Sequence, residues 1–371
     1  MGRALPPGRR AVSLLAIAIV PFAVSLFVCW LMIRLGPKDA PDGGRKTQAA
    51  PVPSSGGVGV LAGMAAGLGS LALMAPSVAE TLVAAPIAGI AGFTVFAALL
   101  GWADDVFGLA ALTKLVALLG GAAAAVVFGP QPGTFWIDGA GVTLPWALGA
   151  VIAVSFIFIM ANAVNFMDGA NGIAMGTSLI ILAALGLMLV PSSLYSPDDR
   201  SQSILMAMCF IAAAALAGFL VWNLPGKLFA GDAGSLSVGG LIGGASVMFA
   251  INGPVLIPLT LCLPILIDVF LTLAWRARHG RPLMQAHRDH AYQLLLRAGW
   301  SHGKVARLWW GMTAICSGAV IAGPFASAAG LYGARCGPLD VIVFSALLIA
   351  GCGLWVRQRV TLGRELSASG R

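Results

Sequence analysis

Residues 143–172 read TLPWALGAVIAVSFIFIMANAVNFMDGANG, an apolar stretch over 143–162 that ends in a polar motif. About 20 mostly apolar residues are what an α-helix needs to cross the hydrocarbon core of a bilayer. The polar motif places amides and one carboxylate at the predicted end of that helix. Carboxylates at a membrane edge are costly, which favours a functional role. The stretch therefore predicts a membrane helix that carries part of a binding site.

The whole chain is rich in apolar residues and poor in charge. Of its 371 residues, 59% are hydrophobic and 10% are charged, whereas soluble domains are about a quarter charged. Its 48 glycines are typical of membrane helices. No stretch is long and polar enough for a separate soluble domain, so residues 1–371 are predicted to form a single transmembrane domain. The six cysteines form no CxxC pair and are interpreted as small packing residues.

Apolar stretches of suitable length predict an all-α, polytopic membrane fold with about eleven transmembrane helices. The predicted spans are 11–33, 56–75, 81–102, 113–129, 143–162, 172–190, 202–222, 235–252, 254–275, 304–324 and 338–356. The first span follows three arginines, as in a signal peptide. Its length of about 23 residues exceeds the 7–15 of a signal-peptide core, so we expect a retained helix.

Lysine and arginine set the predicted orientation. If the segment after the first span is cytoplasmic and the sides alternate, 17 of the 22 Lys and Arg residues fall on the cytoplasmic side. Arg3, Arg9 and Arg10 oppose this bias, but the other connections agree with one another. We therefore expect a multi-pass protein of a bacterial cytoplasmic membrane, with the active site facing the cytoplasm. The lipid bilayer, and no nucleic acid, is the expected environment.

An aspartate pair ends the third predicted span in GWADDVFG (101–108). Neighbouring helical residues diverge by about 100°, so Asp104 and Asp105 can face one point only if the helix ends there. Gly101 and Gly108 permit such an end. A carboxylate here could bind Mg²⁺ or accept a proton from a phosphate. The alternative is a solvated acidic loop.

Two further acidic motifs end at the same face. Asn162, Asn165 and Asp168 recur at every third residue, which places them on one face of a helix. Their amides could bind phosphate or ribose and the carboxylate a metal, unless they are polar contacts between helices. Asp232 in FAGDAGS (229–235) precedes a predicted helix with Ser235 as a plausible N-cap. Because helix N-termini attract anions, this carboxylate suits Mg²⁺ on a diphosphate; the alternative is a simple turn.

The last predicted cytoplasmic loop contains QAHRDHAYQ (285–293). His287, Arg288 and His290 could bind a phosphate or sugar hydroxyls. Positive-inside topology alone would explain the arginines just before this motif. Zinc is not expected, because two histidines lack further ligands nearby. Asp268 lies inside a predicted span, and the sequence offers no partner for it.

Together these motifs resemble the polyprenyl-phosphate N-acetylhexosamine-1-phosphate transferases of glycosyltransferase family 4. The resemblance covers about residues 36–304, and several motifs in order make it specific. They are PVPSSGG (51–57), GWADDVFGL with Lys114, NAVNFMDGANGIA, WNLPGKLFAGDAGS (222–235) and AHRDHAYQLLLRAGWSH (286–302). The resemblance implies transfer of a sugar 1-phosphate from a UDP-sugar to a polyprenyl phosphate, with release of UMP. It also implies Mg²⁺ or Mn²⁺ as cofactor.

Motif chemistry and resemblance together give the candidate site residues. The catalytic candidates are Asp104, Asp105, Asp168 and Asp232, the metal ligands are Asp232 and Asp168, and the substrate-binding candidates are Lys114, Asn162, Asn165, Asn171, Asn223, Phe229, His287, Arg288 and His290. In this interpretation Asp104 or Asp105 positions or deprotonates the lipid phosphate. The resemblance places Asn223 and Phe229 in a uridine pocket. The implied partners are a UDP-N-acetylhexosamine and a polyprenyl phosphate, and a homodimer is left open.

Three departures from the family pattern bear on specificity. Asn171 replaces a frequent second Asp, Gln48 replaces a His, and the segment from Asn223 to Phe229 is one residue shorter. The last loop resembles O-antigen-initiating members and lacks the His-rich loop of phospho-N-acetylmuramoyl-pentapeptide transferase. We therefore expect a UDP-HexNAc donor and an O-antigen-like product, with the pentapeptide transferase as the alternative.

A secondary transporter is the alternative from another class of protein. Transporters place polar residues near the middle of the membrane, often within inverted repeats. Here the acids lie at span ends on one side, and the sequence shows no convincing repeat.

Overall fold

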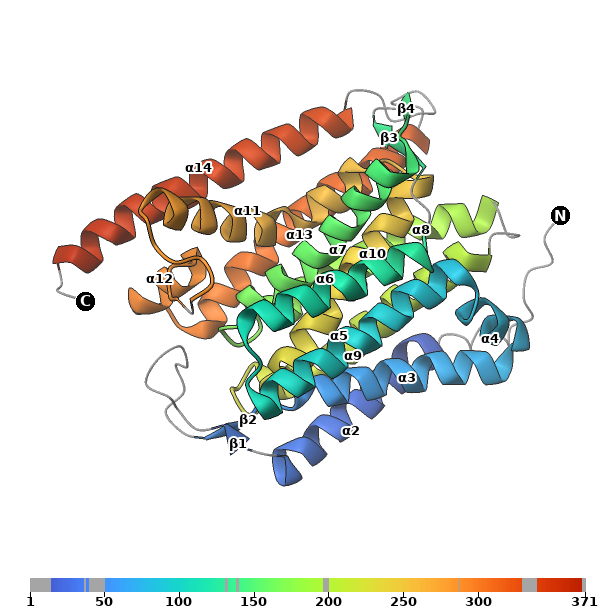
Figure 1. Cartoon of the computed structure of the whole chain (residues 1–371), viewed down its shortest axis with the longest axis horizontal. Coiled ribbons are helices and arrows are strands. Elements are labelled where there is room, and N and C mark those ends of the chain that lie inside the picture. Colours follow the sequence, from blue (N-terminus) through green and yellow to red (C-terminus); the bar gives the residue numbers. More distant parts are fainter. Residues whose placement is uncertain are drawn as a thin grey trace.

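Long apolar helices lie side by side in this computed structural model, which describes residues 15–36, 38–39, 51–130, 133–137, 140–195, 200–285, 287–328 and 339–368 (Figure 1). Residues 11–14 of the first predicted span, Arg3, Arg9, Arg10, Gln48 and Cys336 lie outside these ranges. Each predicted span has a counterpart among the helices.

The elements follow one another along the chain with short connections. They are η1 (Leu15–Ile19), α2 (Val20–Leu35), β1 (Lys38–Asp39), β2 (Val52–Pro53), α3 (Gly56–Met74), α4 (Pro76–Leu82), α5 (Ala85–Phe107), α6 (Ala111–Val127), β3 (Thr134–Ile137), β4 (Ala140–Thr143), α7 (Trp146–Met167), α8 (Ile173–Tyr195), α9 (Arg200–Asn223), α10 (Gly231–Asn252), α11 (Leu256–Arg278), α12 (Ala291–Arg297), α13 (His302–Ala328) and α14 (Leu339–Ala368).

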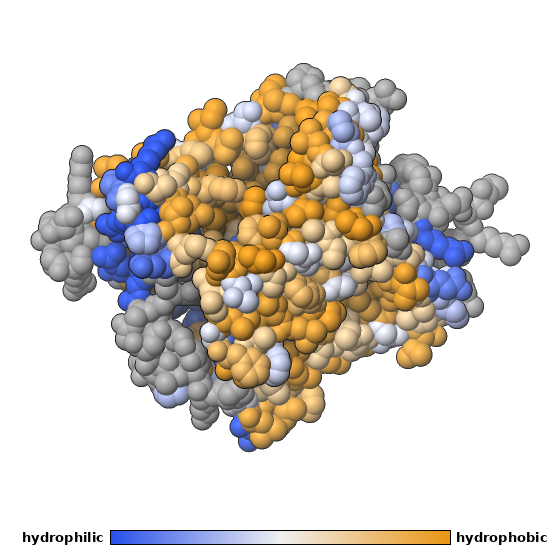
Figure 2. All heavy atoms as spheres, viewed as in Figure 1, coloured by the Kyte–Doolittle hydropathy of each residue, from blue (hydrophilic) through white to orange (hydrophobic). Residues whose placement is uncertain are grey.

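Hydropathy and length agree with a protein that crosses a membrane many times. Among the described residues, ten helices are long and apolar enough to span a bilayer, and α6 is a shorter apolar helix. Figure 2 shows hydrophobic side chains over the middle of the molecule and hydrophilic ones gathered toward two opposite ends. The predicted all-α polytopic fold is therefore confirmed.

The chain departs from the predicted spans in small elements. The span predicted at 81–102 is divided: α4 ends at Leu82, and α5 begins at Ala85 with Pro86 in its first turn, where proline fits without losing a hydrogen bond. Two antiparallel strand pairs, β1 with β2 and β3 with β4, were not predicted. Strands this short carry too few residues for a period-two pattern to be detected.

Helix α10 forms the centre of the bundle. In its most apolar window 94% of the residues are buried, and it packs against α5 and α7. Its glycines permit this close packing: a Cβ built on Gly239 would lie 2.5 Å from the Met160 carbonyl oxygen of α7. Small residues at such contacts are the usual means by which membrane helices approach closely. The start of α10 is consequently held at a fixed position in the bundle.

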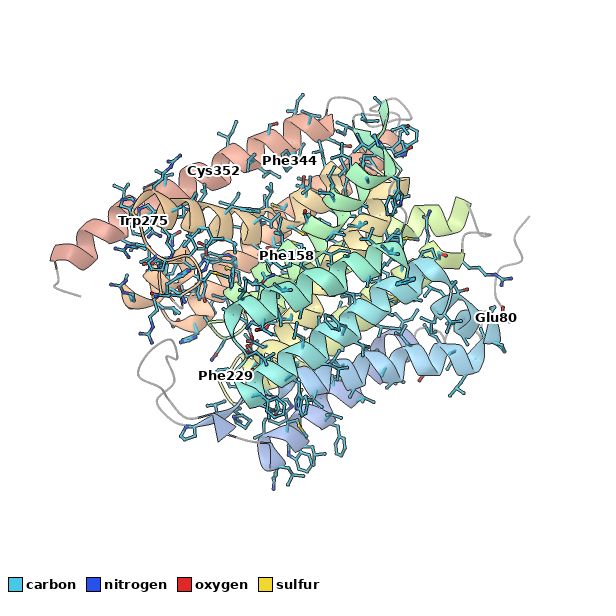
Figure 3. The ribbon with its side chains drawn as sticks, viewed as in Figure 1. Glu80, Phe158, Phe229, Trp275, Phe344 and Cys352 are labelled. Atoms are coloured by element: carbon cyan, nitrogen blue, oxygen red, sulfur yellow. The ribbon has the colours of Figure 1, made fainter. Side chains whose placement is uncertain are left out.

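The two ends of the bundle differ. Phe229 and Trp275 lie at one end, and Glu80 of α4 lies at the other (Figure 3). We call the first the site end, because α5 ends there at Phe107 and α10 begins there at Gly231.

Candidate functional site

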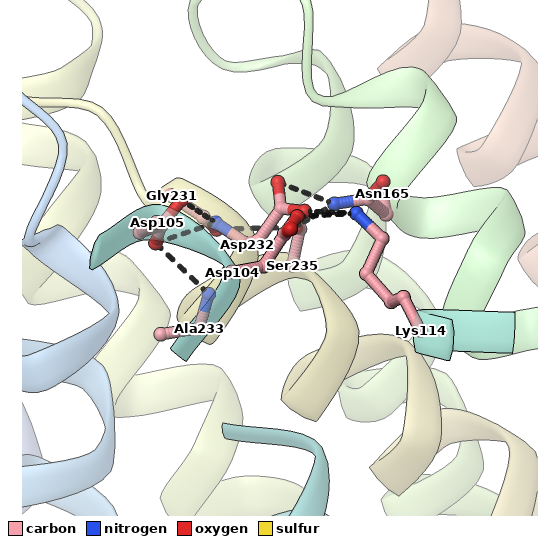
Figure 4. A network of polar contacts seen from close by, with 8 residues as sticks. All are labelled: Asp104, Asp105, Lys114, Asn165, Gly231, Asp232, Ala233 and Ser235. Atoms are coloured by element: carbon pink, nitrogen blue, oxygen red, sulfur yellow. Dashed lines mark hydrogen bonds and ion pairs between the residues drawn. The ribbon is translucent and has the colours of Figure 1, made fainter. Parts of the chain in front are cut away.

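The aspartate pair lies in the last turn of α5. Helix α5 continues to Phe107 and is capped by Gly108, whose φ of 64° lets its N–H donate to the Asp104 carbonyl. The expectation that the helix ends at the pair is therefore wrong. Asp104 and Asp105 diverge but still join one cluster at Asp232 (Figure 4): Asp105 accepts from the Asp232 N–H, and Asp104 is joined to the Asp232 carboxylate through Lys114 of α6.

Helix α10 begins earlier than predicted. It starts at Gly231, so Asp232 lies in its first turn and Ser235 lies inside the helix rather than at its N-cap. The Ser235 hydroxyl donates to the Gly231 carbonyl. Gly231 has a φ of 70°, a conformation that favours glycine, and a Cβ there would meet the Ser54 carbonyl at 2.1 Å. Glycine is thus required where the loop turns into α10.

Asp105 binds the backbone at the start of α10. Its carboxylate oxygens accept hydrogen bonds from the Asp232 N–H at 3.1 and 3.3 Å, and one oxygen also accepts from the Ala233 N–H at 3.4 Å. These N–H groups have no partner within the helix, and a negative charge near them is favourable. Gly101 allows the approach, because a Cβ there would lie 2.3 Å from the Asp232 carbonyl carbon. Asp105 therefore fixes α5 against α10.

Lys114 joins two carboxylates. Its Nζ donates to Asp104 Oδ2 and to Asp232 Oδ2, each at 2.6 Å (Figure 4). The three side chains are 20%, 16% and 19% exposed, so the cluster is largely sheltered but open to solvent on one side. Lys114 lies in the first turn of α6, and the short 108–110 connection brings it back over the end of α5. The ammonium group occupies the position between the two acids.

Asn165 of α7 completes this network, which we call the acidic cluster: Asp104, Asp105, Lys114, Asn165 and Asp232. Its amide donates to Asp232 Oδ1 and to the Ser235 hydroxyl, both at 2.9 Å. The amide thereby orients the carboxylate of Asp232 by binding Oδ1, the oxygen that Lys114 leaves free of its own bond to Oδ2.

The other members of the predicted polar stripe are used differently. Asn162, 8% exposed, donates to the Phe158 carbonyl of its own helix. Asp168 forms the C-terminal cap of α7 and is half-buried, one turn beyond Asn165. Of these three equally spaced residues, Asn165 is therefore the one that contacts Asp232 among the interactions described.

Two stretches hold the loop before α10. Gly56 and Gly57 donate N–H bonds to the carbonyls of Phe229 and Ala230, each at 2.8 Å. Asn223, 3% exposed, accepts from the Gly172 N–H at 2.7 Å and donates to the Leu228 carbonyl at 2.9 Å. Since both ends of its amide bind backbone, Asn223 shapes the loop that carries Phe229, which is itself half-buried. Contact with a substrate at Asn223 stays a prediction.

The basic loop between α11 and α12 is anchored by Asp289. The Asp289 carboxylate pairs with Arg276 of α11 and with Arg281, and its carbonyl accepts from Arg359 of α14. The Arg359 guanidinium also lies 3.7 Å from the centre of the Trp275 ring. These contacts fix the loop to α11 and α14.

The predicted binding residues of this loop differ in exposure. His287 and Arg288 are half-buried, whereas His290 is 3% exposed. The rings of His287 and His290 stack with centroids 5.0 Å apart. His290 is the N-cap of α12 and shares a capping box with Gln293. His290 is therefore a buried residue that stabilises the junction between the loop and α12.

Tyr292 joins this loop to the end of α7. Its hydroxyl donates to the Phe166 carbonyl at 3.0 Å, two residues before Asp168. A Cβ on Gly169 would lie 2.1 Å from the same hydroxyl, so only glycine fits there. Asn171, half-buried, follows in the same turn, and its N–H donates to His302 Nδ1 at 3.2 Å. The basic loop and the asparagine motif thus meet at the site end.

Comparison with known proteins identifies the family. The family model for glycosyl transferase family 4 matches residues 57–250, which contain the whole acidic cluster. The chain belongs to glycosyl transferase family 4. It is therefore an enzyme of that family, built around membrane helices, and the match ends before the basic loop.

Relatives with assigned activities cover most of both chains. A decaprenyl-phosphate N-acetylglucosaminephosphotransferase of Mycolicibacterium smegmatis is 28% identical over 349 residues, covering 86% of this chain and 84% of the relative. The enzyme of the same description from Mycobacterium tuberculosis (strain H37Rv) is 28% identical over 338 residues, covering 84% and 83%. A phospho-N-acetylmuramoyl-pentapeptide-transferase of M. smegmatis is 31% identical over 357 residues, covering 83% and 96%.

The acidic cluster fits a divalent cation that is shared with a substrate. Within the described ranges no three His, Cys, Asp or Glu side chains are grouped to hold a metal ion alone. Mg²⁺ commonly takes one or two carboxylates and completes its coordination with phosphate oxygens and water. Asp104 and Asp232 already direct oxygens at one ammonium group, so positive charge is favoured between them. The atoms that these two carboxylates offer to a metal are oxygens, the ligand type that Mg²⁺ and Mn²⁺ prefer.

Some features of the site have no clear signal in the sequence. The role of Asp289 as an anchor was missed, because its arginine partners are explained equally well by membrane topology. The bridge that Lys114 forms between two aspartates was not predicted either. The sequence shows only that Lys114 comes four residues after Ala110, shortly after the glycine that ends the preceding helix. Asp268 now has partners: it accepts from the Ala291 N–H at 2.8 Å and from the Trp355 indole at 3.1 Å.

Proposed function

We propose that this protein transfers a HexNAc 1-phosphate from a UDP-sugar to a polyprenyl phosphate and releases UMP. The observation that carries the proposal is the convergence of Asp104, Asp105 and Asp232 with Lys114 at the start of a buried helix. Membership of glycosyl transferase family 4 and the names of the relatives support the reaction class. An oxygen of the lipid phosphate attacks the β-phosphorus of the UDP-sugar, and the bond from that phosphorus to the bridging oxygen breaks as UMP leaves.

We assign a different role in the transfer to each residue of the cluster. Such transfers need an in-line nucleophile and neutralised charge more than covalent chemistry by the protein. We assign Asp104 to the attacking phosphate, because Asp105 is occupied by backbone N–H groups of α10. Asp232 and Asp168 would hold Mg²⁺ or Mn²⁺, which neutralises the diphosphate when bound. Lys114 neutralises Asp104 and Asp232 and would lie beside the transferred phosphoryl group.

The remaining candidates are assigned to the donor sugar nucleotide. Asn171 and Phe229 lie at loops of the site end, where a uridine can be bound. His287 and Arg288 are the half-buried members of the basic loop and would bind sugar or diphosphate oxygens. We place the site end in the cytoplasm of a bacterial cell, since the predicted charge bias puts most Lys and Arg residues on that side.

The donor and the product define the finer proposal. The AHRDHAYQ form of the basic loop favours a UDP-HexNAc donor and a lipid-linked sugar that starts a cell-envelope polysaccharide of the O-antigen type. The relatives named as decaprenyl-phosphate N-acetylglucosaminephosphotransferases support the HexNAc and the polyprenyl phosphate. The pentapeptide transferase is the second candidate, because a relative of that description is 31% identical to this chain and the match covers 96% of the relative.

One experiment tests the reaction and the donor together. The purified chain is incubated with undecaprenyl phosphate, Mg²⁺ and either UDP-N-acetylglucosamine or UDP-N-acetylmuramoyl-pentapeptide. UMP is quantified and the lipid product is weighed by mass spectrometry. We expect UMP release only with Mg²⁺, and a lipid heavier by one HexNAc phosphate. A secondary transporter would release no UMP, and a pentapeptide product would establish the second candidate.

A variant pair ties the reaction to the cluster. Asp232→Asn should lower UMP release by at least about 100-fold, because removing a group that stabilises charge in the transition state has effects of that size. Glu80→Gln removes the same charge from the opposite end of the bundle (Figure 3) and should leave the rate unchanged. Full activity in Asp232→Asn would remove the acidic cluster from the mechanism.

A further inference from the structure

A cavity outside the acidic cluster lies between α11, α13 and α14. Its volume is about 210 Å³, and most of its lining is apolar, with Leu263, Ile267, Met312, Ile315, Leu347 and Leu354 among the residues. An apolar cavity of about 150 Å³ in another protein stays dry and binds benzene. This cavity is therefore large enough for part of a hydrocarbon chain.

Two buried polar side chains line the same cavity. Asp268 is 2% exposed, and its Oδ1 accepts from Thr272, the Ala291 N–H and the Trp355 indole. Its Oδ2 has no hydrogen-bond partner in the described part of the chain, and neither has the indole N–H of Trp309, which is also 2% exposed. Buried polar atoms are nearly always paired. Asp268 and Trp309 both line the cavity, so a molecule within it lies beside one side chain with an unpaired acceptor and one with an unpaired donor.

We propose that this cavity binds a membrane amphiphile by its hydroxyl group. The hydroxyl donates to Asp268 Oδ2, and the hydrocarbon chain fills the apolar part. A hydroxyl can also accept from the Trp309 N–H, whereas an ammonium group has no acceptor to offer. The chemistry of the two unpaired atoms therefore favours an alcohol over an amine.

The position of the cavity suits such a molecule. Its lining on α14 runs from Leu347 to Gln358, about 16 Å of helix. The polar residues Asp268 and Gln358 lie toward the site end, beside Arg359, as the polar end of a lipid would. Ile315 and Leu354 are 62% and 44% exposed, so a chain can enter from the surface that faces lipid. Figure 3 shows Phe344 and Cys352 along this same helix.

Binding of a defined alcohol tests the proposal. The full chain in nanodiscs is titrated with radiolabelled 1-dodecanol, and protein-bound label is counted against empty nanodiscs. We expect saturable binding of one molecule per chain. The methyl ether of the same chain accepts a hydrogen bond but cannot donate one, so it should bind about tenfold more weakly. Equal binding of alcohol and ether, or no saturable binding of the alcohol, overturns the proposal.

Two glycines of α14 provide matched variants. A Cβ on Gly351, which lines the cavity, would lie 2.5 Å from the Ile267 side chain, whereas one on Gly353 meets nothing within 4 Å. Gly351→Leu should therefore abolish saturable binding, and Gly353→Leu should keep it. Thermal unfolding of both variants checks that they are folded, and the ether comparison on the unaltered chain does not depend on them. Dodecanol binding to folded Gly351→Leu as tight as to the unaltered chain would place the molecule elsewhere.

Discussion

Replacement of Lys114 by methionine removes the positive charge that joins two carboxylates and keeps a side chain of similar length. In the structure one ammonium group donates to both Asp104 and Asp232 at 2.6 Å. Without it, three aspartates would share one sheltered site with no cation. A divalent ion could supply the missing charge, so the variant should depend on Mg²⁺ for its stability more than the unaltered chain does.

The size of the effect follows from the two hydrogen bonds. Each bond to a charged group contributes about 1.5–3 kcal/mol. The three side chains are 16% to 20% exposed, so solvent screening lowers the summed contribution of the two bonds. We expect Lys114→Met to lose about 2–4 kcal/mol in EDTA, a fall of a few degrees in the thermal midpoint. Saturating Mg²⁺ should recover at least half of that loss.

Thermal unfolding in detergent, with EDTA or with Mg²⁺, measures both quantities. Lys227→Met is the matched control, because Lys227 is exposed and lies outside the cluster; its midpoint should change little. An unchanged midpoint for Lys114→Met in EDTA would refute the stabilising role of the ammonium group. Equal protection of both chains by Mg²⁺ would refute the idea that the ion and the ammonium group both bind the Asp232 carboxylate.

Three further substitutions probe the surroundings of the cluster. Gly101→Ala should cost about 1–3 kcal/mol of stability by overpacking against α10, whereas Gly92→Ala, with open space around it, should not destabilise; denaturation midpoints compare them. Asp105→Asn keeps an acceptor for the α10 N–H groups, so its kcat should fall by less than about tenfold, against at least 100-fold for Asp104→Asn. Tyr292→Phe removes the bond to the α7 end, and steady-state UMP release should show a raised KM for the UDP-sugar with little change in kcat.

The helices and the motifs could be predicted from sequence, because long apolar runs and rare charges leave few alternatives. The convergence of distant residues could not. That Asp105 binds backbone while Asp104 binds Lys114 depends on how α5 ends, and sequence alone suggested an end before the pair. Ser235 was likewise predicted as an N-cap, because side-chain type does not distinguish a cap from a residue inside the helix whose hydroxyl bonds back to Gly231. Asp268 had no visible partner, since its donors come from α12 and α14.

The burial of α10 has a consequence for how the enzyme responds to its membrane. A helix with almost no surface toward lipid cannot tilt by itself when the bilayer becomes thinner or thicker. Such changes are taken up by peripheral helices such as α14, where 6% of the residues in the most apolar window are buried, against 94% in α10. The depth of Asp232 is therefore set by protein neighbours, and we expect it to change little with the lipid composition of the membrane.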